Sequence, residues 1–421
     1  MRTHAATQKD IESPYAWMRL AVSLLLMTIG GCGMYSVTVV LPAIQAEFGV
    51  SRADASLPYT LTMIGFGLGG ILMGRLADRF GVLVPVRMGG LGLGAGFVAA
   101  GLAPNLWLFC AAQGLLIGLL GTSATFAPLV ADTSQWFDRR RGMALAICMS
   151  GNYTAGAVWP PVMQYFIDSV GWRQTYVGMG VFCALSILPL ALVLRRRPPL
   201  HAPETPIAAG AAPRLAGPRP MGMSPLTVQA LLCLAGVSCC VAMSMPQVHI
   251  VAYCGDLGYG AARGAEMLAL MLGLGVISRL ASGWISDRIG GLRTLLLGSL
   301  LQGVALLLFL PFKGLVSLYV VAGLFGLFQG GIVPAYALIV REHFSPREAG
   351  ARVGTVLMAT LFGMALGGWM SGLVFDLTGS YRAAFINGIA WNLLNAAIVV
   401  FLLYRVRSMA LDRSAAPDAA R

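Results

Sequence analysis

Long apolar windows are the feature that most constrains this chain of 421 residues. A window of about 20 apolar residues is long enough to cross a hydrocarbon core of ~30 Å as an α-helix. Apolar residues make up 57% of the chain and charged residues only 11%, whereas a soluble protein carries roughly twice that charged fraction. We therefore predict an all-α membrane protein with twelve transmembrane helices, near residues 16–41, 57–76, 84–103, 106–133, 142–167, 173–194, 226–254, 263–284, 293–311, 315–340, 350–375 and 383–405.

Two sequence motifs each occur twice at almost the same interval. The octapeptide GRLADRFG at residues 74–81 returns as GWISDRIG at residues 283–290. The segments 168–171 and 376–379 both begin with Asp and end with Gly, and their interval differs from the first by one residue. Two repeats in register indicate two similar halves in tandem. In a membrane protein this organisation is typical of secondary transporters.

The distribution of basic residues predicts the orientation in the membrane. Of the 29 Lys and Arg residues, 23 fall in segments on one side and five on the other. The positive-inside rule assigns the richer side, and with it both chain termini, to the cytoplasm. The formal net charge of +12 is thus a topology signal, and no nucleic-acid partner is predicted.

The domain boundaries follow from the spans. We expect a cytoplasmic N-terminal segment (1–15), an N-terminal six-helix bundle (16–194), a Pro- and Ala-rich cytoplasmic linker (195–225), a C-terminal six-helix bundle (226–405) and a cytoplasmic tail (406–421). No cleavable signal peptide is expected, because the first apolar run is too long. All eight cysteines fall in apolar spans without metal-ligand spacing, so neither a metal nor a cofactor is predicted.

The first octapeptide strongly resembles the loop signature of the major facilitator superfamily, Gly-x-Leu-Ala-Asp-Arg-x-Gly. In that family the Asp braces one helix end against a neighbour, so the resemblance implies gating roles for Asp78 and Arg79. Asp287 and Arg288 repeat the arrangement in the second half. A solvated turn whose charges only set topology is the alternative. The basic residue usual after the second Gly is replaced by Val82.

Further motifs narrow the resemblance to the monocarboxylate porter branch, which includes oxalate:formate antiporters. The resemblance covers nearly the whole chain and implies two six-helix bundles, related by an axis along the membrane normal, around a central cavity. The motifs that carry it are residues 14–17, 137–142, 249–258 and 376–382, together with Gly151, the pair Pro160-Pro161 and Arg279.

Arg279 lies inside the eighth apolar span, several residues before the cytoplasmic loop. A guanidinium there costs at least ~2.5–3.5 kcal/mol in hydrocarbon, so it should face a wet cavity or a partner. An Arg fork matches a carboxylate, and Gly275, one turn earlier, offers no neutralising charge. In the resembled family the Arg of this helix contacts the substrate carboxylate. Snorkelling to the interface, or pairing with Asp132, is the alternative.

A single intramembrane cation favours a monoanionic substrate. Family members that carry the dianion oxalate use a second positive charge, from a Lys in the eleventh span. Here residues 353–375 contain no Lys, Arg or His.

Proton-coupling candidates are His249, which can titrate near physiological pH, and Asp132, which can titrate if buried. A structural role for His249, and pairing of Asp132 with Arg139 or Arg140, are the alternatives. The Lys of span one and the Asp one turn before the Arg, present in some relatives, are both missing.

Polar and aromatic side chains from both halves are candidates for lining the cavity. The resemblance places helices one, four, seven and ten along the path, which favours Tyr35 and Tyr336. Packing or interfacial anchoring is the alternative for each candidate. The full set is Tyr35, Gln113, Asn152, Tyr153, Gln329 and Tyr336.

The sequence thus predicts a multi-pass secondary transporter of the cytoplasmic (inner) membrane. Its expected partners are a small organic monocarboxylate, a proton or a counter-anion, and the lipid bilayer. No Walker pattern, zinc cluster or nucleophile elbow occurs, so no enzyme is predicted. An exporter of amphipathic, drug-like compounds is the nearer alternative, and a membrane sensor with a transporter fold the more distant one.

Overall fold

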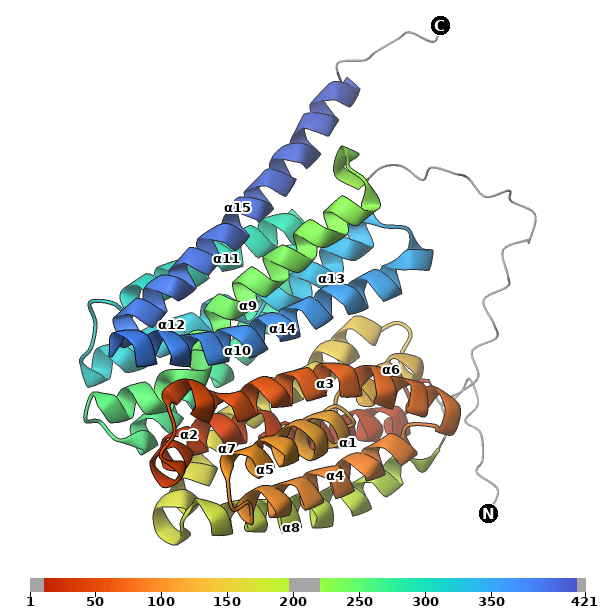
Figure 1. Ribbon diagram of the computed structural model, residues 1–421. Helices are drawn as coiled ribbons and strands as arrows, with labels where there is room; N and C mark the ends of the chain where they lie inside the picture. Colours follow the sequence, from red (N-terminus) through yellow and green to blue (C-terminus); the bar gives the residue numbers. More distant parts are fainter. Residues whose placement is uncertain (1–10, 197–219, 415–421) are drawn as a thin grey trace, which may run out of the picture.

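The computed structural model describes residues 11–196 and 220–414, and within these ranges the chain is helical without strands. Two helical bundles lie side by side, one from each half of the sequence (Figure 1). The predicted segments 1–15, 195–225 and 406–421 lie partly outside the described residues.

The N-terminal half contains six spans, three of which are built from more than one helical segment. The first consists of α1 and α2, the fourth contains a π-helical stretch (η2), and the sixth ends in a 3₁₀ turn (η3). The elements are α1 (Pro14–Gly30), α2 (Cys32–Phe48), α3 (Arg52–Phe80), α4 (Leu83–Gly101), α5 (Leu106–Ala111), η2 (Ala112–Thr122), α6 (Ala127–Trp136), α7 (Arg141–Val170), α8 (Trp172–Ala191) and η3 (Leu192–Arg195).

The C-terminal half repeats this plan after a short 3₁₀ turn (η4). Its tenth span is divided between α12 and α13. The elements are η4 (Pro220–Gly222), α9 (Pro225–Asp256), α10 (Ala261–Ile289), α11 (Gly291–Leu308), α12 (Leu315–Gln329), α13 (Ile332–His343), α14 (Pro346–Thr378) and α15 (Tyr381–Ser414).

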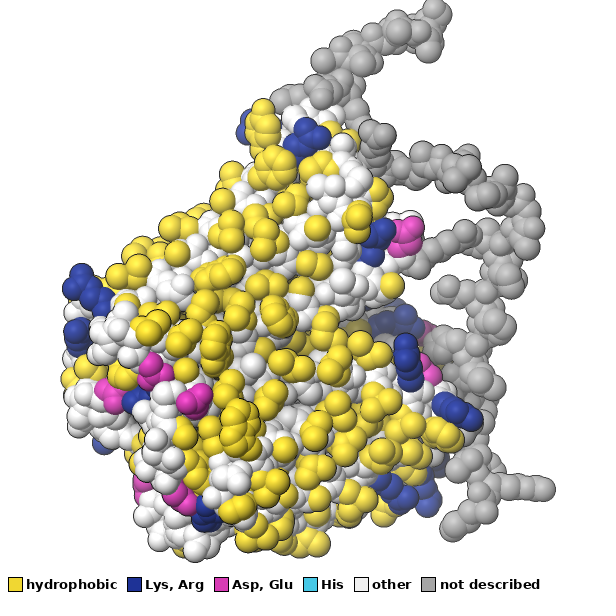
Figure 2. Space-filling view, in the orientation of Figure 1, with side chains coloured by type: hydrophobic (Ala, Val, Ile, Leu, Met, Phe, Trp, Pro, Cys, Tyr) yellow, Lys and Arg dark blue, Asp and Glu magenta, His cyan; other side chains and the backbone are white. Residues whose placement is uncertain are grey.

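The predicted all-α, twelve-span fold is confirmed. Eleven segments of the described chain are long and apolar enough to cross a membrane. The remaining span is α7, which has 30 residues but also carries Asn152, Thr154 and Gln164. On the face shown in Figure 2, apolar side chains form a wide band and charged side chains gather at its two ends. That arrangement fits a bilayer-spanning protein, whose charges avoid hydrocarbon.

The tenth span breaks where it meets α10. A Cβ on Gly330 would overlap the carbonyl oxygen of Gly275, and one on Gly331 would overlap the Ser282 side chain. Glycine permits this close approach because it has no Cβ. The two glycines therefore bring the end of α12 against the turn of α10 that carries Arg279.

A second close approach, between α3 and η2, generates a stability prediction. A Cβ on Gly65 would overlap the carbonyl oxygen of Gly114, whereas one on Gly70, in the same helix, would meet only Ala127 at 3.9 Å. We expect Gly65→Ala to destabilise the protein by about 2 kcal/mol, because packed backbones cannot absorb the extra methyl. Gly70→Ala should be neutral or slightly stabilising. Thermal unfolding of both variants in detergent tests this; equal melting temperatures would contradict it.

Candidate functional site

Within the described residues, the guanidinium of Arg279 makes its cation–π contact and its hydrogen bond with the opposite half of the molecule. Its Cζ lies 4.5 Å from the ring centroid of Tyr153 in α7, and its Nη1 donates to the Met149 carbonyl at 3.4 Å. Its Nε is buried without a hydrogen-bond partner. No carboxylate in the described ranges forms an ion pair with it. The cation is thus held over an aromatic face, with donors left for an anion.

Two glycines allow aromatic rings to pack directly on the helix backbone at this site. A Cβ on Gly275, one turn before Arg279, would collide with the Tyr153 ring, and one on Gly156 would lie 2.9 Å from Tyr35 Cζ. Tyr35 and Tyr153 are both buried. Their rings therefore pack on helix backbone beside Arg279, so three predicted residues, one from α10 and two from the N-terminal half, come together. The glycines were missed by sequence reasoning, although each lies one helical turn from a predicted site residue.

Gln329 lies at the end of α12, directly before the glycines that contact α10. Its Oε1 accepts a hydrogen bond from Gln247 Nε2 at 2.9 Å, and its own Nε2 is buried without a partner. Gln247 was not among the predicted residues. The pair adds an unused amide donor near the helix turn that carries Arg279.

The structure places two other candidates inside their own bundles. Gln113 donates to the Tyr176 hydroxyl at 3.1 Å, and the Tyr336 hydroxyl donates to Asn395 at 2.9 Å. Both side chains are fully buried. Their hydrogen bonds therefore satisfy buried polar groups inside each bundle and do not point to a ligand. Asn152 is half-buried in α7, and its amide lies 4.0 Å from the Met34 sulfur.

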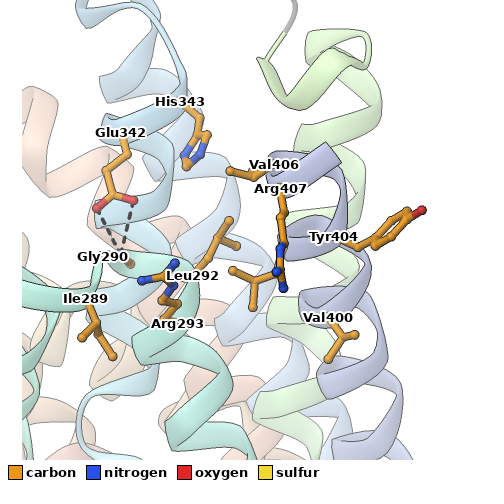
Figure 3. A pocket seen from close by; sticks show the side chains of 12 residues that line it. Ile289, Gly290, Leu292, Arg293, Glu342, His343, Val400, Tyr404, Val406 and Arg407 are labelled. Carbon is orange, nitrogen blue, oxygen red and sulfur yellow. Dashed lines mark hydrogen bonds between the residues drawn. The ribbon is translucent and has the colours of Figure 1, made fainter. Parts of the chain in front are cut away.

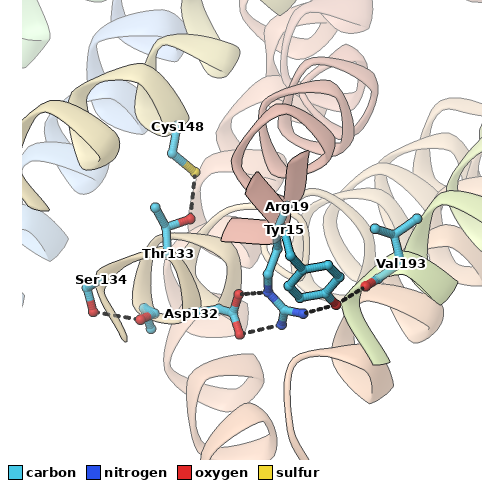
Figure 4. Close-up of polar contacts among 8 residues, drawn as sticks. Tyr15, Arg19, Asp132, Thr133, Ser134, Cys148 and Val193 are labelled. Atoms are coloured by element: carbon cyan, nitrogen blue, oxygen red, sulfur yellow. Dashed lines mark hydrogen bonds and ion pairs between the residues drawn. The ribbon is translucent and has the colours of Figure 1, made fainter. Parts of the chain in front are cut away.

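Asp132 is engaged by Arg19 rather than by Arg139 or Arg140 (Figure 4). The carboxylate accepts from Arg19 Nε at 2.8 Å and from Nη2 at 2.7 Å. Arg19 also lies over the Trp136 ring, 4.7 Å from its centroid, and both charges are buried. Such a bidentate pair joins α1 to α6 within one half, away from Arg279. In residues 11–196 and 220–414 no His, Cys, Asp and Glu cluster could hold a metal ion.

His249 belongs to a network at the end of the molecule opposite the Asp78 and Asp287 loops; the distribution of Arg predicts that this end faces outward, and we call it the outer end. Its Nε2 lies 2.8 Å from the Gly368 carbonyl oxygen, and its Nδ1 lies 3.3 Å from the Tyr381 hydroxyl. Tyr381 in turn accepts from Arg52 Nη1 at 2.5 Å. Arg52 also pairs with Asp256, at 3.1 Å and 3.3 Å. The chain of bonds therefore links α3 of one half to α9, α14 and α15 of the other.

Asp376 completes this outer closure. Its two carboxylate oxygens accept from the backbone N–H groups of Arg52 at 2.9 Å and Ala53 at 2.7 Å. These are free amides at the start of α3, where a helix favours negative charge. Asp168, its equivalent in the first half, accepts a hydrogen bond from Gln164 of its own helix and has no other partner among the described residues. The two equivalent aspartates of the repeat therefore differ in their contacts: Asp376 binds the opposite half, and Asp168 binds its own helix.

The predicted gating residues at the other end are disengaged. Asp78, Arg79, Asp287 and Arg288 are exposed, and neither aspartate has a recorded hydrogen bond or ion pair in the described ranges. The two arginines lie over rings of their own helices. The recorded hydrogen bonds between the halves, apart from the bond of Arg279, join α3 to the outer parts of α9, α14 and α15. The halves are therefore held together at the outer end.

Comparisons with known proteins agree with this architecture. The family model of the Major Facilitator Superfamily matches residues 23–323 and 274–419. The chain therefore belongs to the major facilitator superfamily, as predicted, and is a multi-pass membrane transporter rather than an enzyme.

Individual relatives are distant. The chain is 28% identical over 330 residues to monocarboxylate transporter 13 of Bos taurus, covering 78% of this chain and 75% of that one. It is 27% identical over 353 residues to the uncharacterized MFS-type transporter YcxA of Bacillus subtilis (strain 168), with 81% and 83% covered. These similarities support the resemblance to the monocarboxylate porter branch.

A solved structure shares the fold. It is a bacterial homologue of the human lysosomal transporter Spinster, in an inward-facing and occupied conformation, with a TM-score of 0.69 at 17% identity. The match covers 94% of this chain and 96% of that chain.

The asymmetric use of Asp376 and Asp168 can be tested directly. We expect Asp376→Asn to weaken outer closure by about 1–2 kcal/mol, because the amide keeps one acceptor but loses the charge at the start of α3. The ratio of outer-open to outer-closed molecules should rise roughly five- to thirtyfold. Asp168→Asn is the matched control and should leave it unchanged. Spin–spin distances between labels at residues 102 and 313 report the ratio; equal effects of the two variants would contradict the assignment.

Proposed function

We propose that this transporter moves a small organic monocarboxylate across the cytoplasmic membrane by alternating access, with Arg279 binding the carboxylate. The observation that carries the proposal is the unpaired guanidinium, held over Tyr153 with its Nε buried and unpartnered. A carboxylate would satisfy that donor, and a planar guanidinium can hold it with two parallel bonds.

The charge balance of the site favours a monoanion. Residues 353–375 of α14 contain no Lys, Arg or His, so the eleventh span brings no second positive charge to the interface between the halves. A dianion bound to one guanidinium would leave an uncompensated buried charge, which is costly. Tight, saturable uptake of oxalate would contradict this part of the proposal.

Alternating access follows from where the halves touch. Arg52, Ala53 and Asp376 close the outer end, while Asp78 and Asp287 at the other end have no partner among the described residues. In the reverse state we expect the outer bonds to break and the Asp78 and Asp287 loops to engage. Both termini then lie in the cytoplasm, as the distribution of Arg predicts, and the membrane is the cytoplasmic (inner) membrane.

Proton coupling is supported by the hydrogen-bond directions around His249. The Gly368 carbonyl can only accept, so Nε2 carries the hydrogen and neutral Nδ1 accepts from the Tyr381 hydroxyl. Protonation would place a hydrogen on Nδ1 and deprive that hydroxyl of its acceptor. The charged side chains nearest to this ring are Arg52 and Asp376. Asp256 forms an ion pair with Arg52 and so influences the ring indirectly. Proton binding and outer closure therefore oppose each other, which couples a proton to the conformational cycle.

Arg279 and Tyr153 provide the first test. We expect Arg279→Lys to reduce carboxylate uptake into proteoliposomes at least tenfold, because an ammonium cannot make the bidentate pair. Tyr153→Phe should keep most of the uptake, whereas Tyr153→Leu should lose it with the cation–π contact. Tyr336→Phe is the control, since that hydroxyl bonds Asn395 inside the bundle. Substrate affinity and uptake should be measured together.

The same assay separates the alternatives. Uptake that needs a second anion inside the vesicles would indicate exchange instead of proton symport. Carboxylate flux absent under every condition, with extrusion of amphipathic compounds, would favour the exporter. Tight ligand binding without flux of any kind would favour the sensor.

The His249 network predicts a pH dependence of definite sign. As the pH falls from 7.5 to 5.5, the ratio of outer-open to outer-closed molecules should rise by up to about fivefold, because a protonated ring breaks one buried hydrogen bond worth ~1 kcal/mol. His249→Gln should abolish this dependence. His343→Gln, at the opposite end of the molecule, should preserve it. The spin-label pair at residues 102 and 313 serves as the readout, and a pH response that persists in His249→Gln would contradict the coupling role.

A further inference from the structure

A separate pocket lies on the C-terminal half, at the end that the distribution of Arg predicts to be cytoplasmic. It has a volume of about 910 Å³ and is lined by the α10–α11 junction, the end of α13 and residues 400–407 of α15. Figure 3 shows Arg293 of α11 and Arg407 of α15 projecting into it from facing helices. None of the predicted site residues lines this pocket.

The charges of the pocket are not balanced from within. Arg293 and Arg407 are exposed, and no ion pair with either is recorded in the described ranges. The acidic lining residue, Glu342, accepts from the Gly291 N–H with both oxygens, at 3.0 Å and 3.3 Å. Its carboxylate is therefore committed to the start of α11. Two guanidinium groups remain available to an anion.

Apart from His343, whose Nδ1 lies 3.0 Å from the Ile339 carbonyl oxygen of its own helix, the remaining side chains of the pocket are apolar, and the pocket is open to the side of the bundle. Val400 and Tyr404 of α15 are 51% and 68% exposed, and Leu403 lines the pocket beside them. In a membrane-spanning helix, exposed apolar side chains face lipid. A soluble anion would leave this wall uncovered, whereas a lipid would cover it with an acyl chain.

We propose that this pocket binds a glycerophospholipid with an anionic headgroup, its phosphodiester between Arg293 and Arg407 and one acyl chain along Val400, Leu403 and Tyr404. Arg recognises phosphate through charge-assisted hydrogen bonds, and basic pockets between helices at the cytoplasmic face suit anionic headgroups. The bound lipid would join α11 to α15, so it should stabilise the folded protein. This site is independent of Arg279 and of the transported substrate.

The test compares lipid binding to the purified protein in neutral detergent. Phosphatidylglycerol should raise the melting temperature of the wild type, and phosphatidylcholine should not. The double variant Arg293→Gln/Arg407→Gln should bind phosphatidylglycerol about thirtyfold more weakly, since two basic groups near an anionic headgroup contribute ~2 kcal/mol together. Arg341→Gln is the matched control, because it removes one exposed cation at the same end of α13 without touching the pocket.

Further variants keep the proposal testable if the double substitution does not fold. Each single Gln variant should weaken binding about fivefold, and Arg293→Lys/Arg407→Lys should restore most of it by keeping the charge. Glycerol 3-phosphate should give no shift, because it lacks the acyl chain. The proposal is overturned if Arg341→Gln weakens binding as much as the pocket variants do. A phosphatidylcholine shift equal to that of phosphatidylglycerol, or a full shift with glycerol 3-phosphate alone, would also overturn it.

Discussion

A guanidinium without a carboxylate partner, inside an apolar span, is the constraint on which the rest of the structure depends. A charge inside a membrane span needs contacts that replace its hydration. Here an aromatic face and a backbone carbonyl of the opposite half provide them. Those contacts leave the charge uncompensated. In the proposed function this charge is balanced by the carboxylate of the substrate, which distinguishes a binding site from a structural ion pair.

Arg19 and Asp132 show the contrasting solution in the same molecule. That cation is also buried, but a carboxylate meets it with two short bonds. Removing either partner would strand a buried charge at a cost of roughly 3–5 kcal/mol. We therefore expect Arg19 and Asp132 to stay paired throughout a transport cycle. The two arginines thus differ in whether a carboxylate of the described chain neutralises them, as Asp132 does for Arg19.

The sequence predicts the spans and the repeat well because both depend on local composition and on periodicity. It does not predict the interruptions at Gly31 and at Gly330–Gly331, since these arise where another helix approaches the backbone. The same limit explains the site residues. Tyr35 and Tyr153 join Arg279, but Tyr336 bonds Asn395 of its own half. The partner of Tyr336 is 59 residues away in the sequence. Such a pairing depends on how the helices pack, and residue spacing alone does not predict it.

In the proposed mechanism, closure and binding are carried by different groups, and that separation would allow alternating access. The Arg52, Asp376 and His249 bonds lie at the outer end, whereas Arg279 bridges the halves deeper inside. A ligand shifts a conformational equilibrium only by binding one state more tightly than the other. Arg279 is placed to do so, because Tyr153 and Met149, which contact its guanidinium, belong to the other half. A carboxylate that binds both Arg279 and groups of the N-terminal half would favour the state in which the two halves meet around it.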